Sequence, residues 1–229
     1  MSSLVLKIIA TILMTVEYSG VIIFDNNLVF RYFGRAAFPL FAFLLVEGYN
    51  HTKDDKKRLI RYSLSLLILA LLTEFLYDKL FFGETVYLGS QNPLFELILG
   101  LICLFVYDKF SNSISKVFTV IIVIYLAFMS DFLFINNGAL GILLLFSYYI
   151  IINLNIKNKY KNLLYLLSDI IYIVLFFFTS GGNLLQIGVL LSLIPIALYN
   201  GKKGYKSKAI QYSFYLYYPI LLLILLLFK

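Results

Sequence analysis

The stretch LIRYSLSLLILALLTEFLYDKLF, residues 59–81, decides the fold class of this chain. It is predominantly apolar over the length of about 20 residues that a helix needs to cross a bilayer, and it follows a cluster of basic side chains. Comparable apolar runs recur along the whole chain. Because backbone in lipid must satisfy its hydrogen bonds internally, such runs are helices. The sequence predicts an all-α, polytopic membrane helix bundle, with residues 1–229 forming a single transmembrane domain.

The composition excludes a soluble globular domain. Hydrophobic residues make up 62% of the chain and charged residues 14%, against about 45–50% and about 25% in soluble domains. With one cysteine, Cys103, and one histidine, His51, the chain cannot form an internal disulfide, and no metal site is expected. The sequence also lacks a phosphate-binding glycine loop and a serine nucleophile elbow.

Nine segments are predicted to span the membrane, beginning with an uncleaved first span in which Lys7 interrupts the apolar run. Two of them are short against the ~20 residues that a perpendicular helix needs, and each could instead be a half-helix or an arm of a sunken hairpin. These two are 35–50 and 184–199. The predicted spans are 4–24, 35–50, 59–81, 93–110, 114–134, 138–154, 163–180, 184–199 and 209–228.

Basic residues mark every second loop. The loops after the even-numbered spans hold most of the 19 lysines and arginines, whereas the intervening loops, such as 134–137 and 180–183, hold almost none. This alternation follows the positive-inside rule and predicts a multi-pass membrane protein with a cytoplasmic N-terminus. The Ile-, Asn- and Lys-rich composition fits an AT-rich bacterial genome, so the expected location is a bacterial cell membrane. The net charge of +7 therefore reflects topology, and the expected surroundings are the lipid bilayer rather than nucleic acid.

Several polar side chains lie within or beside the predicted spans, where burial of a charge costs at least a few kcal/mol and indicates a function or a partner. The predicted orientation sorts them into two groups. One group lies toward the cytoplasm and consists of Glu47, His51 and the basic cluster 53–61. The other lies toward the opposite face, as if around a polar cavity that opens outward, and consists of Glu17, Arg35, Glu74, Asp78, Gln91, Asn92, Glu96 and Asp131.

Structural interpretations stand beside the functional ones. Arg35 could be an ion-pair partner of Glu17 or Glu74. Glu74 and Asp78 lie one helical turn apart and could cap the end of their helix. Asp169, within the seventh span, could pair with a lysine of a neighbouring loop.

The run RAAFPLFAFLLVEG at residues 35–48, followed by His51-Thr52, resembles the TraX family of membrane proteins. The resemblance covers nearly the whole chain in order, and the segment from Gly34 to His51 is its most specific part. Further features that carry it are the segment 6–10, Glu74 with Asp78, the turn Phe82-Gly83, Gln91-Asn92, Asp131 with Gly138 and Gly141, and Tyr199-Asn200-Gly201 followed by Tyr215 and Tyr218-Pro219.

The resemblance implies a membrane acyltransferase. The named member of the family acetylates the N-terminal amine of a pilin, and acetyl-CoA or another acyl-CoA is the implied donor. By this resemblance, the catalytic residues would be Glu17, Tyr18, Arg35 and Glu74. The acceptor, a peptide or lipid amine, would be bound by Asp78, Gln91, Asn92, Glu96, Asp131 and Tyr218. The donor would be bound by Glu47, His51, Lys53, Arg58 and Arg61.

The sequence departs from the family pattern at two places. The family usually has Asp-His in the first span, where this chain has Glu17-Tyr18, and a histidine after the C-terminal Tyr-Pro, where this chain has Leu221. Those histidines are the expected general base or acyl relay. Glu17 could serve as the base instead.

The departures leave two other functions open. The chain could be a non-catalytic relative that binds a peptide, a lipid or a partner protein in the same cavity. It could also be a cation- or proton-coupled transporter with Glu17, Glu74, Glu96 and Asp131 as its relay. The sequence has no obvious internal repeat with paired broken helices, which disfavours the transporter.

Overall fold

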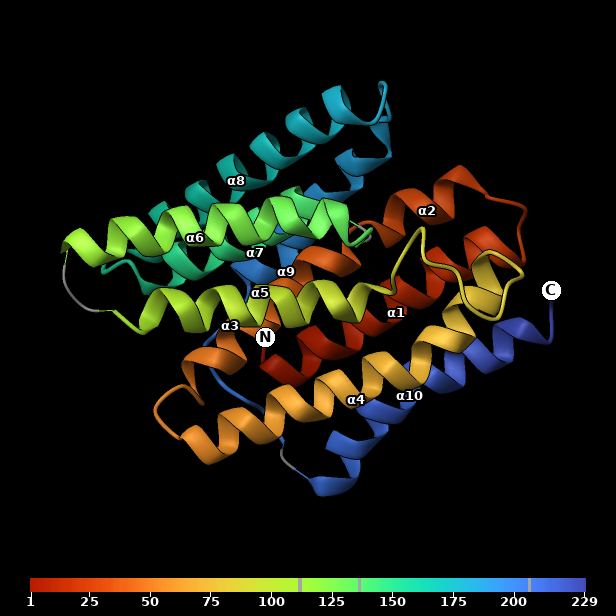
Figure 1. The fold of residues 1–229 in the computed structure, drawn as a ribbon, viewed down its shortest axis with the longest axis horizontal. Coiled ribbons are helices and arrows are strands. Elements are labelled where there is room, and N and C mark those ends of the chain that lie inside the picture. The colour runs from red at the N-terminus through yellow and green to blue at the C-terminus, as the bar shows by residue number, and fades with distance from the viewer. Residues whose placement is uncertain (111–112, 136, 206) are drawn as a thin grey trace.

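A computed structural model describes residues 1–110, 113–135, 137–205 and 207–229, and these form a bundle of helices without a named strand (Figure 1). The long helices run roughly along one direction, the short helices α3 and α9 lie among them, and α2 lies at an edge of the bundle. The elements are α1 (Ser3–Ile22), α2 (Leu28–Gly34), α3 (Ala37–Asn50), α4 (Lys56–Phe81), α5 (Pro93–Asp108), α6 (Ser113–Phe132), α7 (Gly138–Asn153), α8 (Asn158–Thr179), the 3₁₀ helix η1 (Leu184–Ser192), α9 (Leu193–Ala197) and α10 (Lys208–Leu226).

The helices confirm the membrane-bundle prediction and correct two of its segments. Six helical segments of the described residues are long and apolar enough to cross a membrane. The second runs from Leu28 to Asn50, because α2 precedes the predicted 35–50 span. The predicted span 184–199 is a 3₁₀ helix followed by the short α9. A 3₁₀ run of this length is uncommon and often marks a functional or strained segment.

The basic loops and the N-terminus lie at one end of the bundle, as the charge alternation predicts (Figure 1). Lys53, before α4, donates a hydrogen bond to Asp108 at the end of α5, with 3.1 Å between Nζ and Oδ2. Ser3 N donates to the carbonyl of Lys202, which joins the N-terminus to the loop before α10. We call this the basic end.

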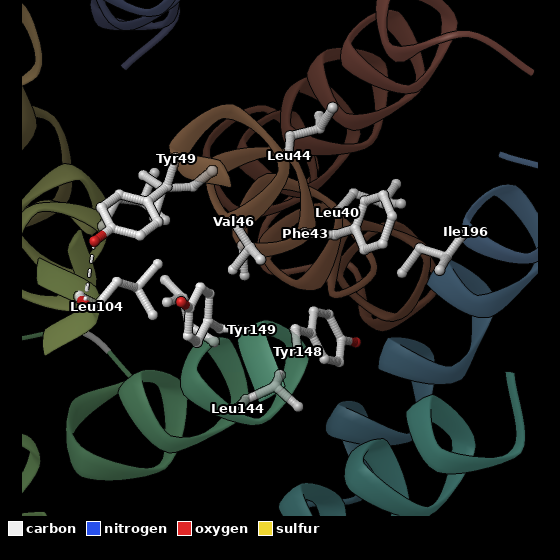
Figure 2. Packing of buried hydrophobic residues seen from close by; sticks show 14 of the residues in the cluster. Leu40, Phe43, Leu44, Val46, Tyr49, Leu104, Leu144, Tyr148, Tyr149 and Ile196 are labelled. Carbon is white, nitrogen blue, oxygen red and sulfur yellow. Dashed lines mark hydrogen bonds between the residues drawn. The ribbon is translucent and has the colours of Figure 1, made fainter. Parts of the chain in front are cut away.

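Helix α7 lies at the centre of the bundle, in contact with α3, α5, α6 and α8. Figure 2 shows Val46 of α3 facing Leu144 and Tyr148 of α7, beside Leu104 of α5 and Ile196 of α9. In lipid, burying an apolar side chain gains little beyond close packing, because the surrounding acyl chains are also apolar. Close packing and polar contacts between helices must therefore fix this arrangement.

Two glycines allow close approach of backbones around α2. A Cβ atom on Gly34 would overlap Glu17 of α1, and a Cβ atom on Gly188 of η1 would overlap the carbonyl group of Tyr32. Any larger residue would push α2 away from both neighbours. The geometry of the Glu17–Arg35 pair depends on this tight packing of α1, α2 and η1.

Candidate functional site

A cavity of about 810 Å³ runs through the bundle from the basic end. It follows one face of α1, where its lining residues recur every three or four positions from Ser3 to Tyr18. At 1.5 Å per residue this face is about 20 Å long. The other walls come from α3, α4, η1 and α10. The polar and charged side chains that line the cavity include Lys7, Glu17, Tyr18, Arg35, Glu47, His51, Arg58, Arg61, Asn137, Tyr172, Gln186, Lys203 and Tyr218.

We call this cavity of about 810 Å³ the main cavity, and an ion pair lies at its inner end. Arg35 Nε is 3.3 Å from Glu17 Oε1, and each side chain is about one-fifth exposed. Glu17 is on the last turns of α1, and Arg35 is the residue that ends α2. The pair confirms the structural interpretation of Arg35 and leaves Glu17 in contact with the cavity.

The opposite part of the main cavity is basic. Arg58 and Arg61 lie on the first turns of α4 and line the cavity together with His51. Glu47 shapes this wall, because its Oε1 atom accepts a hydrogen bond from Tyr199 Oη at 2.6 Å and lies 3.0 Å from His51 Nε2. Four of the five residues predicted to bind the donor therefore gather here. Lys53 does not line the cavity and instead pairs with Asp108.

The remaining acidic residues tie loops and helix ends together on the far side of the bundle. Asp78 Oδ2 accepts from the Tyr87 N–H at 2.8 Å, and Asp131 Oδ1 accepts from the Ala139 N–H at 2.9 Å. The backbone N–H of Gln91 donates to the Phe134 carbonyl. In the part of the chain that the structure describes, none of Asp78, Asp131 and Gln91 lines the main cavity. The predicted gathering of all outer polar groups around one cavity is therefore not found.

Glu74 and Asn92 form a buried polar contact between α4 and α5. Asn92 Nδ2 donates to Glu74 Oε2 at 2.6 Å and to the Ala70 carbonyl at 2.9 Å, while Asn92 Oδ1 caps α5 by accepting from the Leu94 N–H. Neither side chain lines the main cavity in the described part of the chain. Glu74, predicted to be catalytic, instead joins two helices.

We expect Asn92→Ala to destabilise the protein strongly. The change leaves a buried carboxylate and a helix end without their partners, which should cost about 2 kcal/mol or more. Thermal unfolding of the detergent-purified protein can be followed through the buried Cys103, which reacts with a thiol-reactive fluorophore once exposed. The midpoint should fall by about 5 °C or more.

Asn153→Ala is the matched control, since Asn153 is an exposed amide at the end of α7. Equal midpoints for the Asn92 and Asn153 variants would contradict a stabilising role for the contact between Glu74 and Asn92.

The contact of Asp169 differs from the expected pairing with a loop lysine. Asp169 is fully buried, and its Oδ1 atom accepts a hydrogen bond of 2.6 Å from Tyr148 Oη rather than pairing with a loop lysine. The contact joins α8 to the central helix α7. Asp169 thus belongs to the packing of the bundle.

The family model described as TraX protein matches residues 2–229. The chain belongs to the TraX family. It is 27% identical over 240 residues to a protein of Dichelobacter nodosus named "Probable fimbrial assembly protein FimC, serogroup H1", covering 96% of this chain and 92% of that protein. It is 32% identical over 113 residues to an uncharacterized protein of Rickettsia prowazekii, covering 49% and 39% respectively. No solved structure matches.

The two departures from the TraX pattern meet in space. Tyr18 and Leu221 are both buried in one cluster of α1, α4 and α10, together with Tyr218. The hydroxyl groups of Tyr18 and Tyr218 are 3.4 Å apart, and both side chains also line the main cavity. In this TraX-family protein, Tyr18 and Leu221 therefore stand where the family resemblance implies histidines, and Tyr18 lies against the tyrosine of the Tyr218-Pro219 signature.

Two residues of the inner wall, Asn137 and Gln186, are not among the site residues predicted from the sequence. Gln186 is buried on η1 and lines the cavity. Asn137 donates to Glu96 Oε2 at 2.8 Å and accepts from Tyr172 Oη at 3.3 Å. A polar residue inside the short apolar segment 184–199 was a usable signal for Gln186. For Asn137, 41 residues from its partner Glu96, the sequence offered none.

Proposed function

We propose that the protein transfers an acyl group from acyl-CoA to a primary amine. The observation that carries this proposal is the continuity of the main cavity, which has arginines at one end and the Glu17–Arg35 pair at the other. A donor bound at the basic end could present its acyl group deep in the bundle. The setting is a multi-pass membrane protein, and we propose the bacterial cell membrane as its location.

The basic end suits the phosphate groups of a coenzyme A donor. Arg58 and Arg61 are exposed and one helical turn apart, and guanidinium groups bind phosphates through paired hydrogen bonds. Lys7 and Lys203 also line the cavity. The volume of about 810 Å³ lies within the range of cavities that enclose organic ligands.

Glu17 supplies a base for the reaction. The amine nitrogen attacks the thioester carbonyl, a C–N bond forms, and the C–S bond breaks to release the coenzyme A thiolate. The proton lost by the amine goes to the Glu17 carboxylate, and Glu17 then passes this proton to the thiolate, which leaves as a thiol and restores the carboxylate. Arg35 fixes the position of the carboxylate through their contact of 3.3 Å.

The relative from Dichelobacter nodosus suggests the class of acceptor. Its name describes a probable role in fimbrial assembly. We therefore propose that the amine belongs to a subunit of a surface fibre or to another protein of its assembly.

Acetyl-CoA binding tests the donor site. We expect isothermal titration calorimetry on the detergent-purified protein to give a Kd in the micromolar range, and Arg58→Ala with Arg61→Ala together to weaken it by about 100-fold, since each charged hydrogen bond contributes about 1.5–3 kcal/mol. Lys159→Ala, which removes an exposed charge at the start of α8 outside the cavity, is the control. Absence of binding by folded protein, or equal loss in the control, would contradict the donor site.

The tyrosine pair favours a second candidate, a non-catalytic binding protein. Tyr18 and Leu221 replace the histidines that the resemblance implies, and a protein that binds acyl-CoA without turnover would fit this candidate. The transporter gains no support, because Glu74, Glu96 and Asp131 are held by Asn92, Asn137 and Ala139 rather than lining one path.

A further inference from the structure

A second cavity lies at the end of the bundle opposite the basic end. It is an open recess of about 300 Å³ between the α4–α5 loop and the α6–α7 loop, and Gly89, Ser90, Asp131, Asn137 and Gly138 contribute to its wall. We call it the outer vestibule. Its two loops are held together by a hydrogen bond of 2.9 Å from Gln91 N to the Phe134 carbonyl. The vestibule is thus built from ordered contacts between two loops.

Asn137 lines both the outer vestibule and the main cavity. Its side chain donates to Glu96 Oε2 and accepts from Tyr172 Oη, so hydrogen bonds hold it between the two spaces. Tyr172 and Gln186 line the main cavity on the inner side. Asn137 is therefore a residue that the walls of the vestibule and of the main cavity share.

The outer vestibule carries one carboxylate, that of Asp131, whose Oδ1 atom accepts a hydrogen bond from the Ala139 N–H. Asp131 is exposed there, and the described residues of the wall include no lysine or arginine. Glycines keep the space open, because a Cβ atom on Gly138 would overlap Asp131 Oδ1 and one on Gly89 would come within 2.7 Å of the Tyr87 ring. A small recess with one carboxylate suits an ammonium group.

We propose that the outer vestibule is the entrance for the amine acceptor, which is drawn in by Asp131 as an ammonium group and passes Asn137 to reach the main cavity. The donor and acceptor then approach Glu17 from opposite faces. The acceptor role rests on the proposed acyl transfer. The outward access and the cation preference can be measured without turnover, so the two proposals can fail separately.

Cysteine labelling tests the entrance in the full-length protein with Cys103→Ala as background. Asn137→Cys and Ser90→Cys are treated in spheroplasts with impermeant methanethiosulfonates, one carrying trimethylammonium and one carrying sulfonate. We expect both cysteines to react from outside, with the cationic reagent faster by about tenfold and Asp131→Asn removing that preference. Reaction of Asn137→Cys only in inverted vesicles, or equal rates for the two reagents, would overturn the proposal.

The passage between the two cavities is tested with Gln186→Cys. Gln186 lines the main cavity and does not line the outer vestibule. From outside, the cysteine should react slowly, and Tyr172→Phe should accelerate the reaction severalfold by removing one hydrogen bond that holds Asn137. Tyr172→Phe keeps the ring and the Asn137–Glu96 contact, so the fold is expected to survive. An unchanged rate in folded protein would show that Asn137 does not close a passage.

Discussion

Glu17→Gln should lower the rate of acyl transfer by about 100-fold or more, the usual contribution of a general base. The amide cannot take up the amine proton, whereas its size matches that of the carboxylate. Acetyl-CoA binding should change little, because Glu17 lies at the other end of the cavity from Arg58 and Arg61. The measurement is single-turnover acetylation of a peptide N-terminus by the reconstituted protein, followed by mass spectrometry.

Glu84→Gln controls for the loss of one carboxylate, since Glu84 is exposed in the α4–α5 loop. It should retain the full rate. If Glu17→Gln also retained the full rate, Glu17 would not be the base, and one of the hydroxyl groups of the Tyr18–Tyr218 pair would become the next candidate.

Gly34→Ala should impair both folding and transfer. The added methyl group would overlap the Glu17 side chain, and it would lie 2.7 Å from Glu17 Cα, so α1 and α2 must separate. Overpacking of this kind costs about 1–3 kcal/mol, and more where backbone has to move. Arg35 follows directly and would move with α2. We expect a midpoint of thermal unfolding lower by several degrees and the loss of most activity.

Gly48→Ala provides the comparison for stability. The nearest atom to a Cβ at Gly48 would be Tyr62 Oη at 3.9 Å, which is ordinary contact, and alanine favours a helix more than glycine does. An unchanged or raised midpoint is expected. A Gly34→Ala variant as stable and active as Gly48→Ala would contradict the close packing that positions the Glu17–Arg35 pair.

The helical segments could be predicted from the sequence because each apolar run and each basic loop is a local pattern. Helix α2 was missed for a local reason as well. Its segment LVFRYFG lies between the predicted spans 4–24 and 35–50, is short, and carries Arg31, so the pattern of apolar residues does not indicate a span there. Asn27 was the available signal, since its side chain caps α2 by accepting from the Val29 and Phe30 N–H groups.

The site was predictable only where charge or family resemblance pointed to it. Opposite charges in adjacent spans suggested Glu17 or Glu74 as the partner of Arg35, and the structure pairs Arg35 with Glu17. Which outer carboxylates face the cavity could not be predicted, because a carboxylate near a helix end can equally bind a backbone N–H, as Asp78 and Asp131 do. The amide partners Asn92 and Asn137 depend on how helices pack, which the pattern of apolar residues leaves undetermined.

The most direct test of acyl-CoA binding along the main cavity is photocrosslinking with an acyl-CoA that carries a diazirine on its acyl chain. The protein in nanodiscs is irradiated and the modified residues are identified by mass spectrometry, with excess acetyl-CoA as competitor. We predict competed crosslinks at the inner end, on Glu17, Arg35 or Gln186. Crosslinks that are confined to lipid-facing positions, such as those of α6, and are unaffected by acetyl-CoA would contradict binding of acyl-CoA along the main cavity.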